Sequence, residues 1–274
     1  MFDSIAGDYD SLNHILSLDV DKIWRKKALK QIVDAPAPAR VLDLACGTGD
    51  FSIAIAKALS RSHKRVGTPI EAHVKAPAKA PVEAPAKAPV EAQVTSTGFV
   101  TGDSGRSDLM TKGHVTGVDL SEGMLAVMRE KVAKAGLTEM ISIEEGDGEN
   151  LRFPDNTFDR VTIAFGIRNF EDRPKGLREM LRVLKPGGRL VILELSRPEN
   201  KVIRWFYDLY FLHILPKIGG KVSGDKAAYA YLPASVAAFP GKKAFMATMR
   251  EAGFRTVTHK AFTLGICRMY TGEK

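Results

Sequence analysis

The chain has 274 residues, of which 45% are hydrophobic and 26% charged, a composition typical of globular proteins with a core of ordinary size. Two cysteines are too few for a disulfide scaffold. The longest apolar stretch, residues 202–215, is too short to span a membrane and is interrupted by charged residues. The N-terminus lacks the pattern of a secretory signal. We therefore expect a cytoplasmic protein, whose net charge of +8 favours contact with anionic partners such as nucleic acid or a membrane surface.

The predicted elements alternate between strand and helix. Apolar runs predict strands over residues 40–45, 114–119, 140–144, 158–165 and 189–195. Helical spacing predicts helices over residues 51–59, 174–184 and 242–252, and one that begins after the N-cap Ser121. Segments 255–259 and 261–270 are expected to add a closing pair of strands. This alternation is typical of an α/β fold with a mostly parallel central sheet and helices on both faces.

Residues 60–113 interrupt the alternation. The unit APAKAPVE occurs twice in succession, at 76–83 and 84–91, with proline at every fourth position. Proline prevents helix formation, and the stretch has almost nothing apolar to bury, so we expect it to be disordered. The chain is thus predicted to be a single domain, residues 1–274, with an inserted surface loop; a docking arm is the alternative function for the insertion.

A glycine turn follows the first predicted strand. Gly47, Thr48 and Gly49 lie where that strand passes into a helix, and there the backbone can approach a ligand while the helix N-terminus offers unpaired N–H groups. Asp119 ends the next strand, where a carboxylate can accept hydrogen bonds from both ribose hydroxyls. Gly49 and Asp119 are 70 residues apart; subtracting the 54 inserted residues leaves 16, close to the ~20 of nucleotide-binding units.

The pattern fits neither a dinucleotide nor a nucleoside triphosphate. The third residue after Gly49 is Ser52 where a dinucleotide fingerprint has glycine, and no P-loop sequence is present. Acidic residues close the first three strands, at Asp43, Asp119 and Asp147, and Asp147 could bond the amine of an adenine. We interpret these acids as suited to adenosine that carries an ammonium group and no phosphate, which describes S-adenosylmethionine. The alternative is that they only cap helices.

Several motifs resemble those of the menaquinone/ubiquinone biosynthesis C-methyltransferases. They include VLDLACGTGD at 41–50, GVDLSEGML at 117–125, FPDNTFDRVTIAFGIRNF at 153–170 and REMLRVLKPGGRLVILELSRP at 178–198. The resemblance covers nearly the whole chain outside the insertion. It implies a class I S-adenosylmethionine-dependent methyltransferase fold (Rossmann-like) and the methylation of demethylmenaquinol, a polyprenyl quinol, to menaquinol. It also implies donor contacts at Thr48, Asp119, Asp147 and Gly148.

The acceptor chemistry points to the end of the fourth predicted strand. A quinol carbon becomes nucleophilic when its neighbouring hydroxyl loses a proton, so a group that stabilises the resulting oxyanion favours reaction. We hypothesise that Arg168 stabilises this oxygen and that Asn169 orients it. The alternative is that Arg168 forms a structural ion pair, for example with Glu171. The spacing of cysteines and histidines indicates no metal site.

Five aromatic residues lie between positions 205 and 211. We interpret this segment as a wall or lid for the polyprenyl chain that rests on the inner face of the membrane, with Lys201 and Arg204 against lipid phosphates. A buried helix or a homodimer interface is the alternative. The rival functions are a benzoquinol methyltransferase, a nucleic-acid methyltransferase and a non-catalytic adenosyl-binding protein. The chain contains no Pro-Pro motif, and neither cysteine lies near the fourth strand, so we expect no nucleic-acid substrate.

Overall fold

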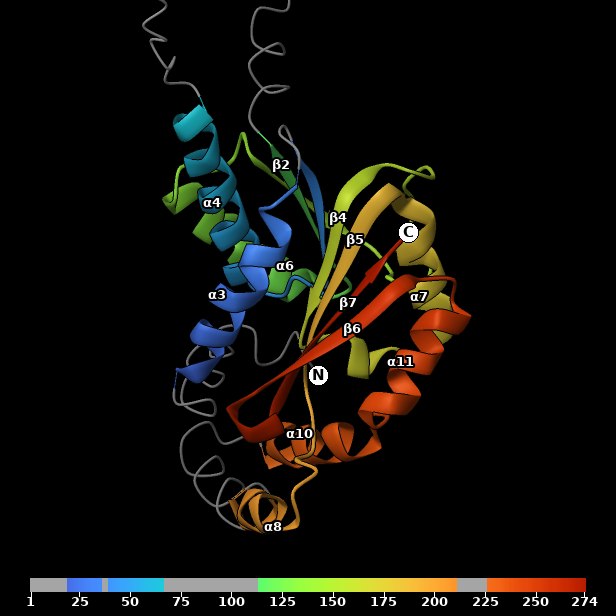
Figure 1. Cartoon of the computed structure of the whole chain (residues 1–274). Helices are drawn as coiled ribbons and strands as arrows, with labels where there is room; N and C mark the ends of the chain where they lie inside the picture. Colours follow the sequence, from blue (N-terminus) through green and yellow to red (C-terminus); the bar gives the residue numbers. More distant parts are fainter. Residues whose placement is uncertain (1–18, 36–38, 67–112, 211–225) are drawn as a thin grey trace, which may run out of the picture.

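The computed structural model describes residues 19–35, 39–66, 113–210 and 226–274. A seven-stranded sheet in the order β3-β2-β1-β4-β5-β7-β6 occupies its centre (Figure 1). Strands β1 to β5 are parallel, whereas β7 is antiparallel to both β5 and β6. The predicted mostly parallel sheet is confirmed. The strands are β1 Arg40–Leu44, β2 His114–Asp119, β3 Ile141–Glu145, β4 Phe158–Ala164, β5 Leu184–Leu195, β6 Arg255–Phe262 and β7 Cys267–Glu273.

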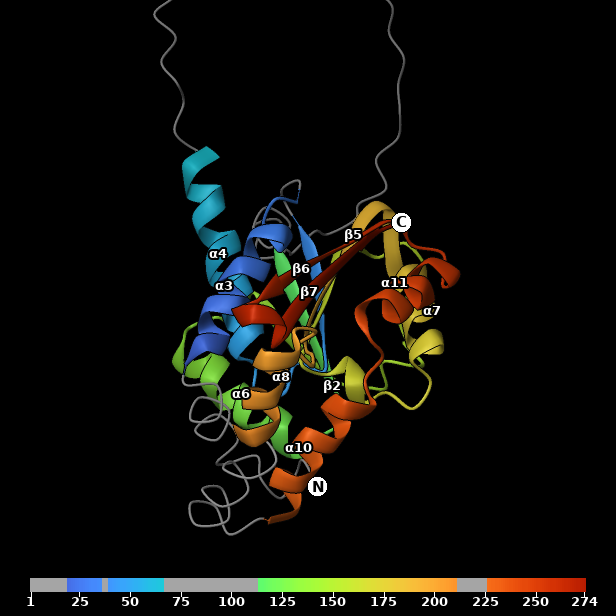
Figure 2. The ribbon, with the colours of Figure 1, turned by 60° about the horizontal axis from the view of Figure 1, so that its bottom comes forward.

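Helices cover both faces of the sheet, as predicted. On one face lie α3 (Val20–Ile32), α4 (Asp50–Val66) and α6 (Glu122–Lys134), and on the other α7 (Arg173–Val183) and α11 (Lys242–Glu251) (Figure 1). Two further helices, α8 (Lys201–Leu209) and α10 (Lys226–Ala238), lie at the end of the molecule where the parallel strands finish; Figure 2 turns this end toward the viewer. None of the helices in the described residues has the length and apolar character of a membrane span.

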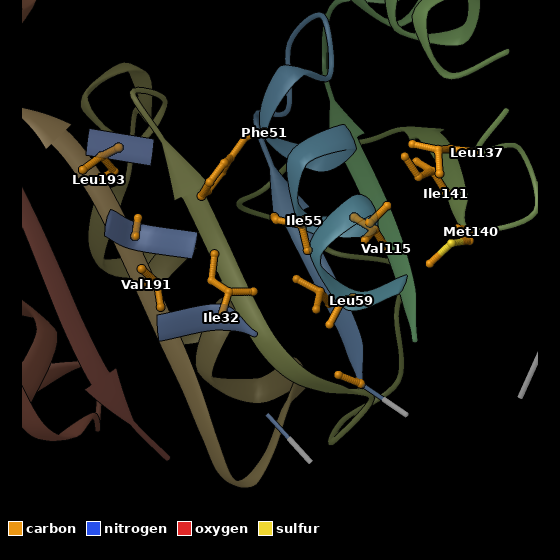
Figure 3. Close-up of a cluster of buried hydrophobic side chains, with 14 of the residues drawn as sticks. Ile32, Phe51, Ile55, Leu59, Val115, Leu137, Met140, Ile141, Val191 and Leu193 are labelled. Carbon is orange, nitrogen blue, oxygen red and sulfur yellow. The ribbon is translucent and has the colours of Figure 1, made fainter. Parts of the chain in front are cut away.

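Two apolar clusters hold the layers together. In the first, Phe51, Ile55 and Leu59 line one side of α4 and pack toward β1, β2 and β3, where Val115 is fully buried (Figure 3). Their spacing of four residues explains why α4 could be recognised in the sequence. In the second, α7 and α11 bury their apolar sides against the opposite face of the sheet.

Several predicted boundaries are wrong; β5, for example, begins at Leu184 rather than at residue 189. Helix α4 continues to Val66, past the expected start of the insertion at residue 60, because the first helix-breaking residues are Gly67 and Pro69. The predicted strand 261–270 is interrupted by η3 (Thr263–Gly265), whose three residues all have positive φ and so turn the chain from β6 into β7. Residues 67–112 lie outside the described residues, and their disorder stays a prediction.

Candidate functional site

A cavity of about 330 Å³ lies at the carboxyl ends of β1, β2, β3 and β4. Its walls come from the turn after β1, the end of β2, the loop after β3 and the segment 164–171 after β4. The sheet order reverses between β1 and β4, and open α/β sheets bind their ligands at such a reversal. The volume is in the range of small-molecule sites.

The Asp119 carboxylate organises the turn after β1. Its Oδ2 accepts a hydrogen bond from the backbone N–H of Gly47 at 2.8 Å, and its Oδ1 accepts one from the N–H of Ser121 at 2.9 Å. A carboxylate has about four acceptor positions, so two backbone N–H groups do not by themselves exclude a ligand hydroxyl. Gly47 and Asp119 both line the cavity, so the structure brings these two predicted residues together.

Two strained residues mark the turns after β1 and β4. Ala45 and Phe165 line the cavity with φ values of 48° and 62°, a left-handed conformation that costs a residue with a side chain about 1–2 kcal/mol. The turns also touch: a Cβ on Gly166 would lie 2.5 Å from the Cβ of Ala45. Such strained residues cluster at functional sites. Here the left-handed conformation directs both turns around the cavity.

Helix α3 covers the cavity segment after β4. The ring of Trp24 lies 6.2 Å from that of Phe165, and the guanidinium carbon of Arg25 lies 5.6 Å from the same ring centre. The indole N–H of Trp24 donates a hydrogen bond to the hydroxyl of Thr263 at 2.9 Å. The sequence predicts no helix over these residues, although the N-terminal segment with Trp24 is a candidate for a lid over the donor; that lid stays a prediction.

The loop after β3 carries two more predicted residues, Asp147 and Gly148, and both line the cavity. Asp147 accepts a hydrogen bond from the N–H of Glu149 at 2.8 Å. A Cβ on Gly148 would lie 2.5 Å from Cζ of Phe170, so glycine is needed for this close packing. Glu149 was not predicted; its two oxygens accept hydrogen bonds from the N–H groups of Glu171 and Asp172 and tie this loop to the start of α7.

Three of the residues predicted at or near the glycine turn lie beside the cavity rather than in its lining. The Thr48 hydroxyl is buried and accepts a hydrogen bond from Lys131 at 3.3 Å. Gly49, at φ 83°, packs so closely on Met128 that a Cβ would lie 2.4 Å from Cγ of that side chain. Asp43, interpreted as a ligand-facing acid, is instead 1% exposed within β1. These positions form the layer beneath the glycine turn.

The interpretation of Asp43 as a ligand contact is therefore wrong. Its Oδ2 accepts a hydrogen bond of 2.6 Å from the hydroxyl of Ser52 in α4. Burial raises the pKa of the Asp43 carboxyl to about 7, although the hydrogen bond from Ser52 and the charge of Arg25 act in the opposite direction.

Arg168 and Asn169 occupy η1 (Ile167–Asn169) but face different surroundings. Asn169 lines the cavity. Arg168 does not: it is 8% exposed, and its Nη1 donates to Oε1 of the fully buried Glu194 at 3.0 Å and also to the carbonyl oxygen of Phe165. The hypothesis that Arg168 stabilises the acceptor oxygen, directly or through water, stays a prediction. The structure has the alternative, a structural ion pair, with Glu194 as the partner in place of Glu171.

Within the described residues, no three His, Cys, Asp or Glu side chains are grouped as metal ligands would be. Four acidic residues line the cavity, and the described lining contains no lysine or arginine. The field in the cavity thus favours a cationic ligand and disfavours a phosphate. The acids are Asp119, Asp147, Glu149 and Glu171.

Comparison with known proteins gives a consistent result. The chain is 43% identical over 274 residues to a Geobacter sulfurreducens protein named "Ubiquinone/menaquinone biosynthesis C-methyltransferase UbiE", covering 100% of this chain and 87% of the relative. It is 38% identical to a "Demethylmenaquinone methyltransferase" of Bacteroides fragilis, covering 100% of this chain and 91% of that protein.

Among solved structures, a SAM-dependent methyltransferase from Aquifex aeolicus aligns with a TM-score of 0.52 at 18% identity, over 90% of this chain and 88% of that one. This likeness shows the class I methyltransferase fold. The model of the ubiE/COQ5 methyltransferase family matches residues 1–274. The chain therefore belongs to the ubiE/COQ5 methyltransferase family.

Proposed function

We propose that this methyltransferase transfers the methyl group of S-adenosylmethionine to a ring carbon of demethylmenaquinol and so forms menaquinol. The names of the Geobacter and Bacteroides relatives support a quinone substrate. The observation that carries the proposal is a single cavity in which the carboxylate of Asp119, beside the glycine turn, and the carboxamide of Asn169 both form part of the wall. The side of the cavity with Asp119 can hold an adenosyl group, while the side with Asn169 can contact the acceptor.

The cavity residues fit the donor. Asp119 can accept hydrogen bonds from both ribose hydroxyls, and Asp147 can accept one from the adenine amine. The sulfonium and the ammonium group of the donor are positive, which matches a lining with four acidic residues and no basic one among the described residues. Gly47 and Gly148 let the backbone approach the ligand.

The reaction balances without a further co-reactant. The donor supplies a methyl group on a positively charged sulfur; a bond forms between this methyl and the ring carbon as the carbon–sulfur bond breaks, and the ring proton leaves to water. The residues of the chain hold the ring carbon in line with the methyl group, since alignment of two reactants contributes much of the rate. A hydrogen bond to the quinol oxygen favours the ionised, nucleophilic acceptor. In this proposal the side-chain carboxamide of Asn169, in the cavity wall, donates this hydrogen bond.

We also propose a peripheral contact with the membrane, where a polyprenyl quinol resides. On α8, the side chains of Val202, Trp205 and Phe206 are 65%, 61% and 60% exposed. An exposed apolar side with tryptophan and phenylalanine is typical of amphipathic helices that lie in the membrane interface. Leu209 lies one turn further along the same side and is 38% exposed. The expectation of a buried helix is wrong for the described part of this segment, residues 202–210; residues 211–215 lie outside it.

Other exposed apolar side chains lie at the same end of the molecule. Leu120 follows β2 directly, Leu264 lies in the turn between β6 and β7, and Ile23 precedes Trp24 in the first turns of α3. The cavity is at this end too. A bilayer met by this surface would present the quinol head group close to the donor, and the net charge of +8 favours an anionic bilayer.

Incubation of the purified protein with radiolabelled donor and either demethylated quinol tests the function. We expect label to enter the naphthoquinol far faster than the benzoquinol. Faster transfer to the benzoquinol would move the assignment to the ubiquinone pathway. Binding of the donor by calorimetry without transfer to either quinol would overturn the proposal.

A further inference from the structure

Among the described side chains, two hydrogen bonds join helix α10 to η1. The hydroxyl of Tyr231 lies 2.8 Å from Oδ1 of Asn169, and Nε of Arg168 donates to the hydroxyl of Ser235 at 3.3 Å. Tyr231 and Ser235 are four residues apart and so lie on the same side of the helix. One of these bonds reaches a residue of the cavity wall, and the other reaches a residue behind it.

The backbone of η1 is also held from β5. The N–H of Arg168 donates to Oε2 of Glu194 at 3.1 Å, and its guanidinium donates to Oε1 of the same carboxylate at 3.0 Å. Glu194 is fully buried. The turn therefore keeps its position through this ion pair, and the hydrogen bond from Tyr231 acts on the side chain of Asn169 rather than on the course of the chain.

A carboxamide has two ends of opposite character. Its oxygen accepts hydrogen bonds and its nitrogen donates two, and rotation by 180° exchanges them at little steric cost. A phenol hydroxyl that donates to Oδ1 selects one of these two states. With the oxygen engaged by Tyr231, the nitrogen is the end of Asn169 that can donate a hydrogen bond to a ligand oxygen.

We propose that Tyr231 is a positioning residue that orients the Asn169 carboxamide so that its nitrogen donates to the quinol oxygen beside the reacting carbon. This inference rests on the proposed function and deepens it. The donated hydrogen bond favours the ionised quinol, whose hydroxyl proton passes to water, and thereby lowers the pH at which the bound acceptor becomes nucleophilic. Without Tyr231 the carboxamide populates both orientations, and one of them places an oxygen against the oxyanion.

Tyr231→Phe tests this, with Ser235→Ala as the matched control, because each variant removes one of the two bonds between α10 and η1. For Tyr231→Phe we expect kcat at pH 7 to fall about tenfold, the loss expected for one hydrogen bond. The ionisation seen in the pH profile of kcat moves to higher pH, so kcat recovers toward the wild-type value in alkaline buffer. Donor affinity, measured by calorimetry, stays within about twofold of wild type. Ser235→Ala changes kcat less than about threefold and leaves the pH profile in place.

Other outcomes for these variants contradict the inference. Equal losses in Tyr231→Phe and Ser235→Ala, or a loss in Tyr231→Phe that is the same at every pH, assign Tyr231 to holding α10. An unchanged kcat in Tyr231→Phe removes it from the reaction. In the background of Asn169→Ala, Tyr231→Phe has no further effect if it acts through Asn169, and an additive loss contradicts that route. Wild-type protein that binds the donor but methylates neither quinol is a failure of the proposed function instead.

Discussion

The Asp119 carboxylate and the N–H of Gly47 form a 2.8 Å hydrogen bond between residues that lie 72 positions apart in the chain. The bond joins the end of β2 to the turn after β1, because these strands are parallel neighbours. It places the acid that we propose to bind the ribose, and the glycine of the turn beside it, on the same wall of the cavity. The inserted segment enters and leaves at the opposite end of these strands and does not separate them.

Replacing Asp119 by Asn should weaken donor binding about 10- to 100-fold, since hydrogen bonds to a charged group contribute about 1.5–3 kcal/mol each. Isothermal titration calorimetry measures the affinity. Asp159→Asn is the matched control: Asp159 also accepts a backbone N–H, that of Arg40, but at the opposite end of the parallel strands. We expect the control to bind the donor like wild type. Wild-type affinity in Asp119→Asn would contradict the placement of the ribose.

The Arg168–Glu194 ion pair should contribute to stability as a unit. Replacing either residue by Ala leaves an uncompensated charge in a buried position, and such changes cost about 3–5 kcal/mol. In Arg168→Met/Glu194→Leu no charge remains, so the loss of unfolding free energy should be much smaller than the sum of the two single losses. Urea denaturation measures all three variants. If Arg168→Ala unfolds like wild type but is inactive, Arg168 acts on the acceptor directly.

Much of the fold follows from local patterns in the sequence. Strand β2 begins and ends at the predicted residues, and Ser121 caps α6 by accepting a hydrogen bond from the N–H of Met124 at 3.2 Å. Helix α3 was missed although Trp24, Ala28 and Ile32 recur every four residues and are buried, a signal that the many lysines around them obscured. Helix α10 was missed because Pro233 lies inside it.

The candidate site could be predicted where the order of the strands alone fixes the position of a residue. Asp119 ends β2 and Asp147 lies in the loop directly after β3, so the order of strands alone brings them to one edge. The partner of Arg168 was not predictable: Glu194 lies 26 residues away, and its pairing depends on β5 lying beside β4. The displacement of Asp43 from the cavity has a similar cause, because β1 ends at Leu44 and the next residue, Ala45, forms the wall.

The buried Asp43 should make stability depend on pH. Burial raises the pKa of its carboxyl to about 7, against ~3.9 in an unfolded chain, so the folded state favours the protonated form. The stabilisation from this group is complete below about pH 4 and is lost as the pH rises through 7. The slope is at most about 1.4 kcal/mol per pH unit.

Asp43→Asn removes the titrating group while keeping an oxygen for the Ser52 hydroxyl. We expect the unfolding free energy of the variant, relative to wild type, to increase between pH 4 and 7, as measured by urea denaturation at each pH. Ser52→Ala should shift the wild-type transition to higher pH, because the hydrogen bond from Ser52 lowers the pKa of Asp43. Curves for Asp43→Asn and wild type that run parallel from pH 4 to 8 contradict the raised pKa.

Trp205 provides a direct probe of membrane contact. The chain has two tryptophans, and the other, Trp24, is 4% exposed, so a change in emission on adding vesicles reports mainly on Trp205. With vesicles of phosphatidylglycerol and phosphatidylcholine we expect a blue shift, and quenching when the lipid acyl chains carry bromine. Vesicles of phosphatidylcholine alone should bind less, because they lack the anionic charge.

Trp205→Glu/Phe206→Glu should abolish co-sedimentation with these vesicles, since each charge enters the apolar side of α8. Ala133→Glu/Thr138→Glu is the matched control. Ala133 and Thr138 are exposed, and each substitution adds one negative charge, as in the α8 variant. The two residues lie at the other end of the molecule, where the parallel strands begin. This control should bind vesicles like wild type, and both variants should unfold like wild type because the four positions are exposed. The contrary outcome is a blue shift that needs no lipid and rises with protein concentration, together with a dimer mass in sedimentation. That result would make the exposed side of α8 a contact between two copies of the chain, since the same apolar surface cannot face both a partner and a bilayer.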